Sequence, residues 1–371
     1  MEYMTGTLAD GTTPYREFKQ NEGKVVSVKG AIHNIRDMSD FAFIILRTAR
    51  ELIQCVYSPE FSDYRLAENV VEQASAKVTG KVVKSETRDG SERFELQIHD
   101  IEILSVPAAI PPVVISKKKV NCDLNTDLDF RPVTLRNPSE RAVFKIQEGI
   151  QRGFREYLSK NGFTEIHTPK INFAGAEGGT NVFKLDYFGK TVFLAQSPQL
   201  YKQALVPVYE RVFEIGPVFR AEHHDTSRHL NEYISMDFEM GFIDSFTDIM
   251  EMETGVLKYI MELLKTEYAP EVELLKADIP QIDKIPCIRF KDAKELCVKK
   301  LKNITDMKDF EPEEEAFLGK WAKQQYGSDF LFVTHYLSKK RPFYTMDDPE
   351  DPEVTLSFDL LFRGIEITSG G

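Results

Sequence analysis

The chain has 371 residues and a mass of 42.5 kDa, and 42% of its residues are hydrophobic and 29% charged. This composition excludes a disordered chain and is sufficient for two globular domains. The formal net charge of −12 lacks the basic excess typical of nucleic-acid binders, so composition leaves the partners open. The first residues do not have the basic segment followed by an apolar segment that is typical of a signal peptide, and no apolar run is long enough to span a membrane. We therefore expect a soluble, cytoplasmic protein.

Residues 1–106 contain short β-branched runs separated by turns, with a helix-like stretch, Tyr64–Gln73, between the third and fourth run. The five runs are Val25–Ile35, Phe41–Arg47, Leu52–Tyr57, Ala76–Lys84 and Arg93–Leu104. This order predicts an all-β OB-fold barrel, a domain type that binds oligonucleotides or sugars; another small β-barrel is the alternative. Because the segment has more acidic than basic residues, we expect any nucleic acid to be read through a few base contacts.

A proline-rich segment, Val106–Val114, predicts an extended linker, and three consecutive lysines, residues 117–119, follow it. We therefore place a hinge at residues 107–136. The lysines are either a solvated charge run or a contact for a phosphate backbone.

Residues 137–371 are expected to form an α+β domain on an antiparallel sheet, because strand and helix patterns follow each other without regular alternation. Asn137-Pro138 is a typical helix start, and the helical period continues to Asn161. The further strands expected are Thr164–Thr168, Thr191–Leu194, Val212–Arg220, Ile234–Phe242, Phe330–Thr334 and Thr355–Phe362, and the further helices are Phe246–Glu267, Phe290–Lys300 and Glu311–Gln325.

The segment from Arg211 to Met240 reads as two apolar strands joined by a polar loop with charged ends. Arg220 and Arg228 have the geometry to hold phosphate oxygens in a bidentate manner, and Glu222 can bond a base. The alternative is a salt-bridged hairpin surface. The histidines of this loop lack the spacing of a zinc site.

Two other groups of residues suggest ligand binding. Ser197-Pro198 predicts a helix start that places Gln199 and Lys202 on one helical face, where Lys202 could neutralise a carboxylate; an exposed lysine is the alternative. Asp359, Glu366 and Ser369 offer the hard oxygen ligands that Mg²⁺ prefers, provided that Gly364 bends the strand; unrelated surface acids are the alternative.

Five sequence segments resemble a known enzyme family. FRAEHHDTSRHLNEYISMDFEM resembles motif 2 of class II aminoacyl-tRNA synthetases, and the segment around Pro169 resembles motif 1. AEGGTNVF, LAQSPQLYKQ and SFDLLFRGIEITSG resemble the amino-acid pocket of the aspartyl members. The resemblance, from about Tyr15 to Gly371, implies a class II synthetase domain behind an anticodon-binding OB-fold. It also implies an aspartate–tRNA ligase that activates L-aspartate with ATP and esterifies the 3′ end of tRNA-Asp.

The resemblance also implies roles for individual residues. In the ATP site, Arg220 would hold the α-phosphate and the transition state, Arg228 would hold the γ-phosphate, and the remaining contacts would come from Glu222, His229, Leu230, Tyr233 and Glu366. The aspartate pocket would comprise Glu177, Gln199, Lys202, Arg220 and Ser369. The ligands of Mg²⁺ would be Asp359, Glu366 and Ser369. The anticodon would be read by Phe43, Gln54 and Glu95. A homodimer through motif 1 near Pro169 is implied as well.

Three questions stay open at this point. The residue after Gly30 is Ala31, where discriminating relatives often have tryptophan, so charging of tRNA-Asn as well as tRNA-Asp is a hypothesis. An asparaginyl-tRNA synthetase is disfavoured, because a buried Lys202 facing a neutral amide would be uncompensated. The chain stops before the family's motif 3, so a truncated enzyme of little activity, or a catalytically incomplete tRNA-binding fragment or paralogue, is the alternative.

Overall fold

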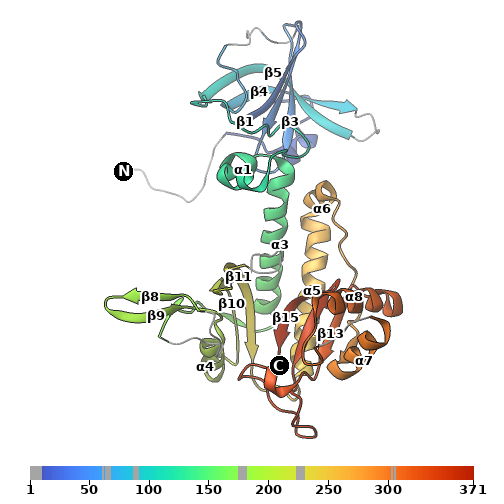
Figure 1. Ribbon diagram of the computed structural model, residues 1–371. Coiled ribbons are helices and arrows are strands. Elements are labelled where there is room, and N and C mark those ends of the chain that lie inside the picture. Colours follow the sequence, from blue (N-terminus) through green and yellow to red (C-terminus); the bar gives the residue numbers. More distant parts are fainter. Residues whose placement is uncertain are drawn as a thin grey trace. The chain divides into compact units, whose positions relative to one another are not determined.

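The computed structural model describes residues 11–60, 62, 68–86, 92–173, 182–222, 230–301, 304 and 306–371. The chain divides into two compact units, Met1–Arg141 and Ala142–Gly371, which are coloured from blue to green and from green to red in Figure 1. None of the described helices is long and apolar enough to cross a membrane.

The first unit contains a closed β-barrel whose strands are joined in the order β1-β2-β3-β5-β4. These strands are β1 (Val25–Asp37), β2 (Ala42–Arg47), β3 (Leu52–Tyr57), β4 (Ser75–Glu86) and β5 (Glu92–Ser105). The barrel confirms the predicted OB-fold architecture. The predicted helix Tyr64–Gln73 falls partly outside the described residues, and its described part, 68–73, forms turns where we expected a helix.

The side chains of β2 alternate between the interior and exterior of the barrel. In β2, Ala42, Ile44 and Leu46 are buried in the barrel core, whereas Phe43 and Arg47 lie on the outer face and are half-buried. This period of two follows from the pleat of a β-strand. The outer face of β2 is therefore available for binding.

Short helices lie before and after the barrel in the sequence. Two 3-10 turns, η1 (Tyr15–Glu17) and η2 (Lys19–Asn21), precede the barrel, and α1 (Leu124–Asp129) and α2 (Arg131–Thr134) follow it. Asn137 accepts a hydrogen bond from the Ser139 amide and donates to the carbonyls of Ile115 and Lys117. The buried Asn137 thus starts α3 (Pro138–Lys160) as predicted and also fixes the preceding linker.

The second unit combines helices with three small sheets of order β11-β10-β6, β12-β13-β14-β15 and β7-β9-β8. The described strands are β6 (Thr164–Glu165), β7 (Ile171–Asn172), β8 (Lys184–Tyr187), β9 (Lys190–Leu194), β10 (Arg211–Phe219), β11 (Glu232–Met240), β12 (Cys287–Arg289), β13 (Phe330–Thr334), β14 (Phe358–Phe362) and β15 (Ile365–Gly370). The further helices are α4 (Gln199–Tyr209), α5 (Thr247–Glu267), α6 (Ala269–Leu275), α7 (Phe290–Lys300), α8 (Pro312–Tyr326) and η3 (Ser338–Lys340). The predicted antiparallel pairing dominates, but β6 with β10 and β12 with β13 run parallel.

The β10–β11 hairpin has one apolar and one polar face. Phe213 and Phe238 are cross-strand partners on the apolar face, and both pack edge-on or tilted against Phe154 of α3. The same core includes Val256 and Ile260 of α5. Because α3 and α5 cover this face, the opposite face of the hairpin remains for polar side chains.

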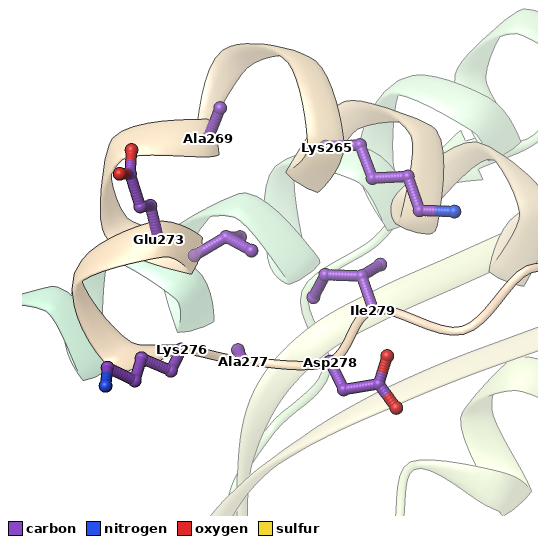
Figure 2. Close-up of a pocket in the computed structure, with 8 residues that line it drawn as sticks. Lys265, Ala269, Glu273, Lys276, Ala277, Asp278 and Ile279 are labelled. Carbon is purple, nitrogen blue, oxygen red and sulfur yellow. The ribbon is translucent and has the colours of Figure 1, made fainter. Parts of the chain in front are cut away.

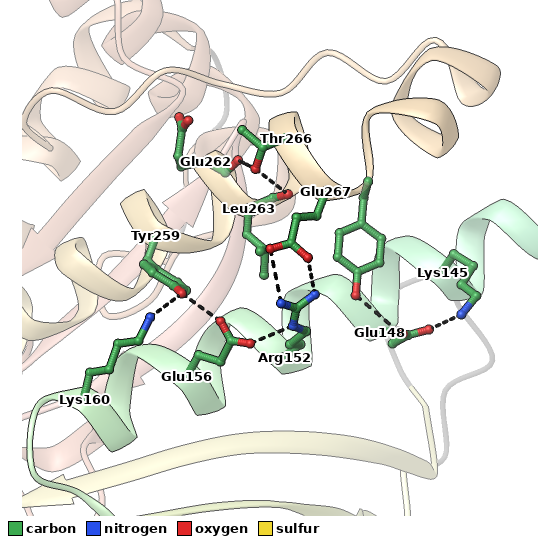
Figure 3. Close-up of polar contacts among 11 residues, drawn as sticks. Lys145, Glu148, Arg152, Glu156, Lys160, Tyr259, Glu262, Leu263, Thr266 and Glu267 are labelled. Carbon is green, nitrogen blue, oxygen red and sulfur yellow. Dashed lines mark hydrogen bonds and ion pairs between the residues drawn. The ribbon is translucent and has the colours of Figure 1, made fainter. Parts of the chain in front are cut away.

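Polar contacts reinforce the packing of α3 against α5, as Figure 3 shows. Arg152 donates to Glu156 (2.7 Å) and to Glu267, and the Tyr259 hydroxyl donates to Glu156 (2.7 Å). Such exposed pairs contribute little on their own, so the aromatic and aliphatic core supplies most of the stabilisation.

Candidate active site

The polar face of the β10–β11 hairpin presents the side chains predicted to bind the nucleotide. The register pairs Val218 with Tyr233, and Arg220 follows on the same face, with its guanidinium 5.8 Å from the Tyr233 ring centre. Glu222 is half-buried and Leu230 is 63% exposed. Arg228 and His229 lie outside the described residues. The structure therefore brings Arg220 and Tyr233 together.

Helix α4 brings Gln199 and Lys202 against β11. Gln199 donates to Glu239 (3.2 Å), and the Lys202 ammonium lies 3.1 Å from Asp237 and 3.7 Å from Glu239. Gln199 and Lys202 are buried, because they face the sheet. Ser235 also donates to Asp237. Glu177 was also predicted for this pocket, but it lies outside the described residues.

The ion pairs of Lys202 change the specificity argument made from the sequence. We expected a buried lysine without a counter-charge, but Asp237 and Glu239 already neutralise it. An ammonium has three donors, so Lys202 can still bond a ligand carboxylate. Its charge alone no longer excludes asparagine. Asp237 and Glu239 were missed because we interpreted this strand as apolar, although Ser235, Asp237 and Glu239 alternate with period two.

Glu214 of β10 anchors the segment next to Pro169. Its buried carboxylate accepts from the Thr168 amide (2.9 Å) and hydroxyl (2.7 Å) and pairs with Lys170 (3.0 Å). A Cβ atom at Gly216 would lie 3.2 Å from the Glu214 carboxylate, so a larger residue would crowd this anchor. The backbone around Pro169 is thereby fixed to the same sheet as Arg220.

Asp359, Glu366 and Ser369 belong to a β-hairpin and not to one bent strand as expected. Asp359 in β14 pairs with Ser369 in β15, and Glu366 pairs with Leu361 after a bulge. The turn is Arg363-Gly364, with φ values of 50° and 80°, a left-handed conformation that suits glycine. The cross-strand register therefore puts all three predicted metal ligands on one face of the hairpin, with Asp359 and Ser369 at its open end and Glu366 next to the turn.

Arg341, which was not predicted from the sequence, lies at the centre of the group formed with Asp359 and Ser369. It donates to Asp359 (2.6 Å), Ser369 (3.2 Å) and Ser357 (3.0 Å), and its guanidinium lies 3.9 Å from the Tyr336 ring centre. Burial, followed by the Asp359 charge, raises the pKa of Tyr336 well above its usual value, so its hydroxyl stays protonated. No local pattern marks Arg341, because only the tertiary fold brings it to β14.

The donor set of this cluster suits a hard divalent cation. Desolvation, followed by the charges of Asp359 and Glu315, raises the pKa of Glu366 to about 8. Among the described residues no group of three or more His, Cys, Asp or Glu side chains could hold a metal ion by itself. Two carboxylates and a hydroxyl instead fit Mg²⁺, which usually completes its shell with water and substrate phosphates.

The three predicted anticodon-reading residues lie on one outer face of the barrel. The register places Gln54 opposite Ile45, two residues from Phe43 on the same face. Gln54 donates to Glu95 of β5 (2.7 Å), and Phe43 packs edge-on against Phe41 at 5.4 Å. An aromatic ring and a fixed amide are thus presented together.

A surface hollow of about 710 Å³ lies beside α6, and none of the predicted site residues lines it. In Figure 2, its wall carries aliphatic side chains such as Ile279, and Lys276 and Glu273 stand at its rim. The hollow is open, and the polar clusters described above carry the stronger chemical argument.

Comparisons with known proteins identify relatives of both units. Residues 123–371 match the family described as tRNA synthetases class II (D, K and N), and residues 26–104 match the OB-fold nucleic acid binding domain. A Deinococcus radiodurans protein named "Aspartate--tRNA(Asp/Asn) ligase" is 46% identical over 96% of this chain and 81% of its own length. A Pyrococcus abyssi protein named "Aspartate--tRNA(Asp) ligase" is 36% identical over 94% of this chain and 80% of its own length.

Among solved structures, asparaginyl-tRNA synthetase from Pyrococcus horikoshii, complexed with asparaginyl-adenylate, is similar with a TM-score of 0.82. Its sequence is 26% identical, and the match covers 94% of this chain and 79% of that chain. The matches to these relatives and to the solved structure extend over both units of the chain.

Proposed function

The chain belongs to the class II tRNA synthetases of the aspartate, lysine and asparagine group, and we propose that it is an ATP-dependent ligase that forms aspartyl-tRNA. The observation that carries this proposal is the 46% identity over nearly the whole chain to a relative named as an aspartate–tRNA ligase, together with the Gln199–Lys202 pocket. In the first step the aspartate α-carboxylate attacks the α-phosphorus of ATP and displaces pyrophosphate. In the second step the terminal adenosine hydroxyl of the tRNA takes the aspartyl group from the adenylate.

Arg220 is the catalytic residue of the first step in this proposal. Two negatively charged reactants must approach each other, so catalysis consists mainly of charge neutralisation and in-line positioning. Arg220 would hold the α-phosphate, and its place beside Tyr233 supports this role because the ring would stack on adenine. Glu222, Arg228, His229 and Leu230 complete the proposed ATP site.

The proposed aspartate pocket lies between α4 and β11. Lys202 would bond the substrate β-carboxylate, and Gln199, fixed by Glu239, would orient it. Glu177 and Ser369 are the other proposed contacts. The negative charges of Asp237 and Glu239 would also attract the substrate ammonium group.

Asp359, Glu366 and Ser369 would hold Mg²⁺ that arrives with ATP. The ion would neutralise charge on the ATP phosphates. Arg341 keeps Asp359 and Ser369 in place from the protein side through its two hydrogen bonds.

In the barrel, Phe43 would stack on an anticodon base, and Gln54 and Glu95 would bond base edges. We propose tRNA-Asn as a second acceptor, because the most similar relative described above has a name that includes both tRNAs. The other relative is named for tRNA-Asp alone, so the two acceptors must be compared directly. Aspartylation of tRNA-Asp but not tRNA-Asn transcripts would contradict the second acceptor.

We also propose a homodimer through the segment near Pro169. Two large apolar side chains that follow it, Ile171 and Phe173, are 48% and 72% exposed, which is typical of an interface. Analytical ultracentrifugation would show a dimer, and a monomer at micromolar concentration would contradict it.

The experiment that tests the function is ATP–pyrophosphate exchange with aspartate or asparagine, followed by aminoacylation. Exchange that depends on aspartate supports the ligase. Exchange that depends on asparagine would identify an asparagine-activating enzyme. The solved asparaginyl-tRNA synthetase described above is similar to this chain in fold. Binding of tRNA without exchange would identify a catalytically incomplete tRNA-binding protein.

A further inference from the structure

Arginine side chains of the first unit converge at one end of the outer barrel face. The Arg47 Nη2 and Arg136 Nη1 atoms both donate to the Gln73 Oε1 atom, at 3.3 Å and 3.2 Å. The two nitrogens are therefore at most about 6.5 Å apart. Arg141 adds a third positive charge and donates to the Thr48 carbonyl (3.0 Å). We name Arg47, Arg136 and Arg141 the arginine cluster.

The hydrogen-bond partners of Arg47 and Arg136 are neutral groups. Arg47 also donates to the His33 Nδ1 atom (3.1 Å), and Arg136 donates to the Pro132 carbonyl (3.2 Å). Within the described ranges, neither Arg47 nor Arg136 has a carboxylate within 4.0 Å. Burial, followed by the charges of Arg47 and Arg141, lowers the pKa of His33 to about 4, so His33 is neutral at pH 7.

The charges of the cluster repel one another. Burial, followed by the charges of Arg136 and Arg141, lowers the pKa of Arg47 to about 10. Arg47 and Arg136 are only half-buried, so a ligand can reach them. A phosphate would neutralise the repulsion and match two guanidinium groups in geometry.

The opposing explanation is that the cluster merely ties the segment after the barrel to its wall. A single neutral or carboxylate contact would do this without bringing like charges together. Gln73, which gathers the two arginines, has φ of 70°, a left-handed conformation that is uncommon outside glycine. This arrangement favours a ligand over a simple tether.

The position of the arginine cluster relative to Phe43 favours a phosphate of an RNA backbone as its ligand. Arg47 lies on the same outer face of β2 as Phe43, four residues farther along the strand. At about 3.3 Å per residue, this separates the two positions by about 13 Å. An RNA strand with one base on Phe43 would thus have its backbone within reach of the cluster.

We propose that Arg47 and Arg136 bind a phosphodiester group of the tRNA anticodon arm, with Arg141 adding charge. This inference depends on the proposed binding of tRNA by the barrel, and it adds a backbone contact that does not depend on base sequence.

The test measures binding of fluorescently labelled tRNA-Asp to the full chain over a series of KCl concentrations. We expect R47Q and R136Q each to weaken binding about tenfold. Each should also reduce the slope of log affinity against log salt by about 1. A tRNA with an altered anticodon should lose affinity by the same factor, whereas an F43A variant should affect the two tRNAs unequally. The isolated anticodon stem-loop should show the same losses as the whole tRNA.

The matched control is R16Q, which removes one charge from a side chain that is 80% exposed and should leave the slope unchanged. R47K and R136K keep the charge, so they should retain most of the slope even if packing is weakened. An unchanged slope in R47Q and R136Q would overturn the proposal, as would a loss seen with whole tRNA but not with the stem-loop. If the unaltered chain binds no tRNA, the proposed function fails together with this inference. Normal binding with an unchanged slope in the variants refutes the arginine site alone.

Discussion

Lys202, the proposed partner of the substrate β-carboxylate, is a buried charge with two acidic neighbours. It is held by Asp237 and Glu239, so its position is fixed before any substrate arrives. A fixed ammonium group avoids the entropy cost of ordering a flexible lysine during binding.

Replacement of Lys202 by alanine should abolish most aspartate-dependent ATP–pyrophosphate exchange, with a loss of at least about a hundredfold. The reason is that Asp237 and Glu239 would then repel the substrate β-carboxylate without compensation. The measurement is exchange at saturating ATP over a range of aspartate concentrations. K160A, which removes an exposed lysine bonded to Tyr259, serves as the control. Near-normal exchange in K202A would refute the pocket.

Glu253 of α5 is a second buried charge, but without an equivalent partner. It is 5% exposed, its Oε2 atom has no hydrogen-bond partner, and desolvation raises its pKa to about 7. Because the pKa of Glu253 is about 7 in the folded state and 4.5 in the unfolded state, the folded state holds the proton more tightly. The resulting stabilisation is present below pH 4.5 and is lost as the pH rises toward 7.

Glu253→Gln should therefore stabilise the chain more at high pH than at low pH. The expected gain is about 1 kcal/mol at pH 5 and about 3 kcal/mol at pH 8, from the pKa difference. Urea denaturation of both proteins at the two pH values measures it. E251Q changes an exposed carboxylate of the same helix and should show no such trend. If the two proteins differ in free energy of unfolding by the same amount at both pH values, the raised pKa of Glu253 is contradicted.

At the scale of secondary-structure elements, α7 and α8 are joined by a fully buried ion pair. The Lys294 ammonium lies 2.6 Å and 2.7 Å from the two Glu314 oxygens, and both side chains are 2% exposed. Glu314 also accepts from the Glu311 amide and completes the capping box of α8. One carboxylate thus connects two helices and starts one of them.

K294M should destabilise the chain by about 3–5 kcal/mol, because Glu314 would be left as an unpaired buried charge. The double variant K294M/E314Q should recover most of this loss, since glutamine is neutral and can keep the contact with the Glu311 amide. Chemical denaturation of the three proteins tests this. Equal destabilisation of the single and double variants would show that packing, and not charge, dominates.

At the scale of the whole molecule, the chain consists of two units, each with its own apolar core. The barrel core includes Ile44, Leu46 and Ile53, all fully buried, and the second unit has separate cores around Phe213 and Val333. A closed barrel leaves no unpaired strand edge, which favours independent folding.

A fragment of residues 1–141 should therefore fold cooperatively and bind tRNA without supporting ATP–pyrophosphate exchange. Circular dichroism melting tests the folding, and titration with labelled anticodon stem-loop tests the binding. A fragment of residues 142–371 is the complementary control and should not bind the stem-loop. An unfolded 1–141 fragment would show that the barrel depends on the second unit.

Local patterns in the sequence were sufficient for most elements. Alternating β-branched runs predicted the five barrel strands, and Asn137-Pro138 predicted the start of α3, because strand period and helix capping depend on neighbouring residues. The resemblance to motif 2 also led to Arg220 and Tyr233, which the hairpin register brings together. The strand β15 was missed because its turn at Gly364 was interpreted as a bend within one strand.

What the sequence alone determined was the two-domain organisation, the β10–β11 hairpin and the choice of most candidate site residues, since these depend on periodicity and short motifs. Only the tertiary structure showed that Asp237 and Glu239 neutralise Lys202, that Arg341 bonds Asp359 and Ser369, and that the arginine cluster forms. These contacts join residues 18 to 63 positions apart. Charge pairing over such distances depends on how the elements pack, and no local pattern encodes it.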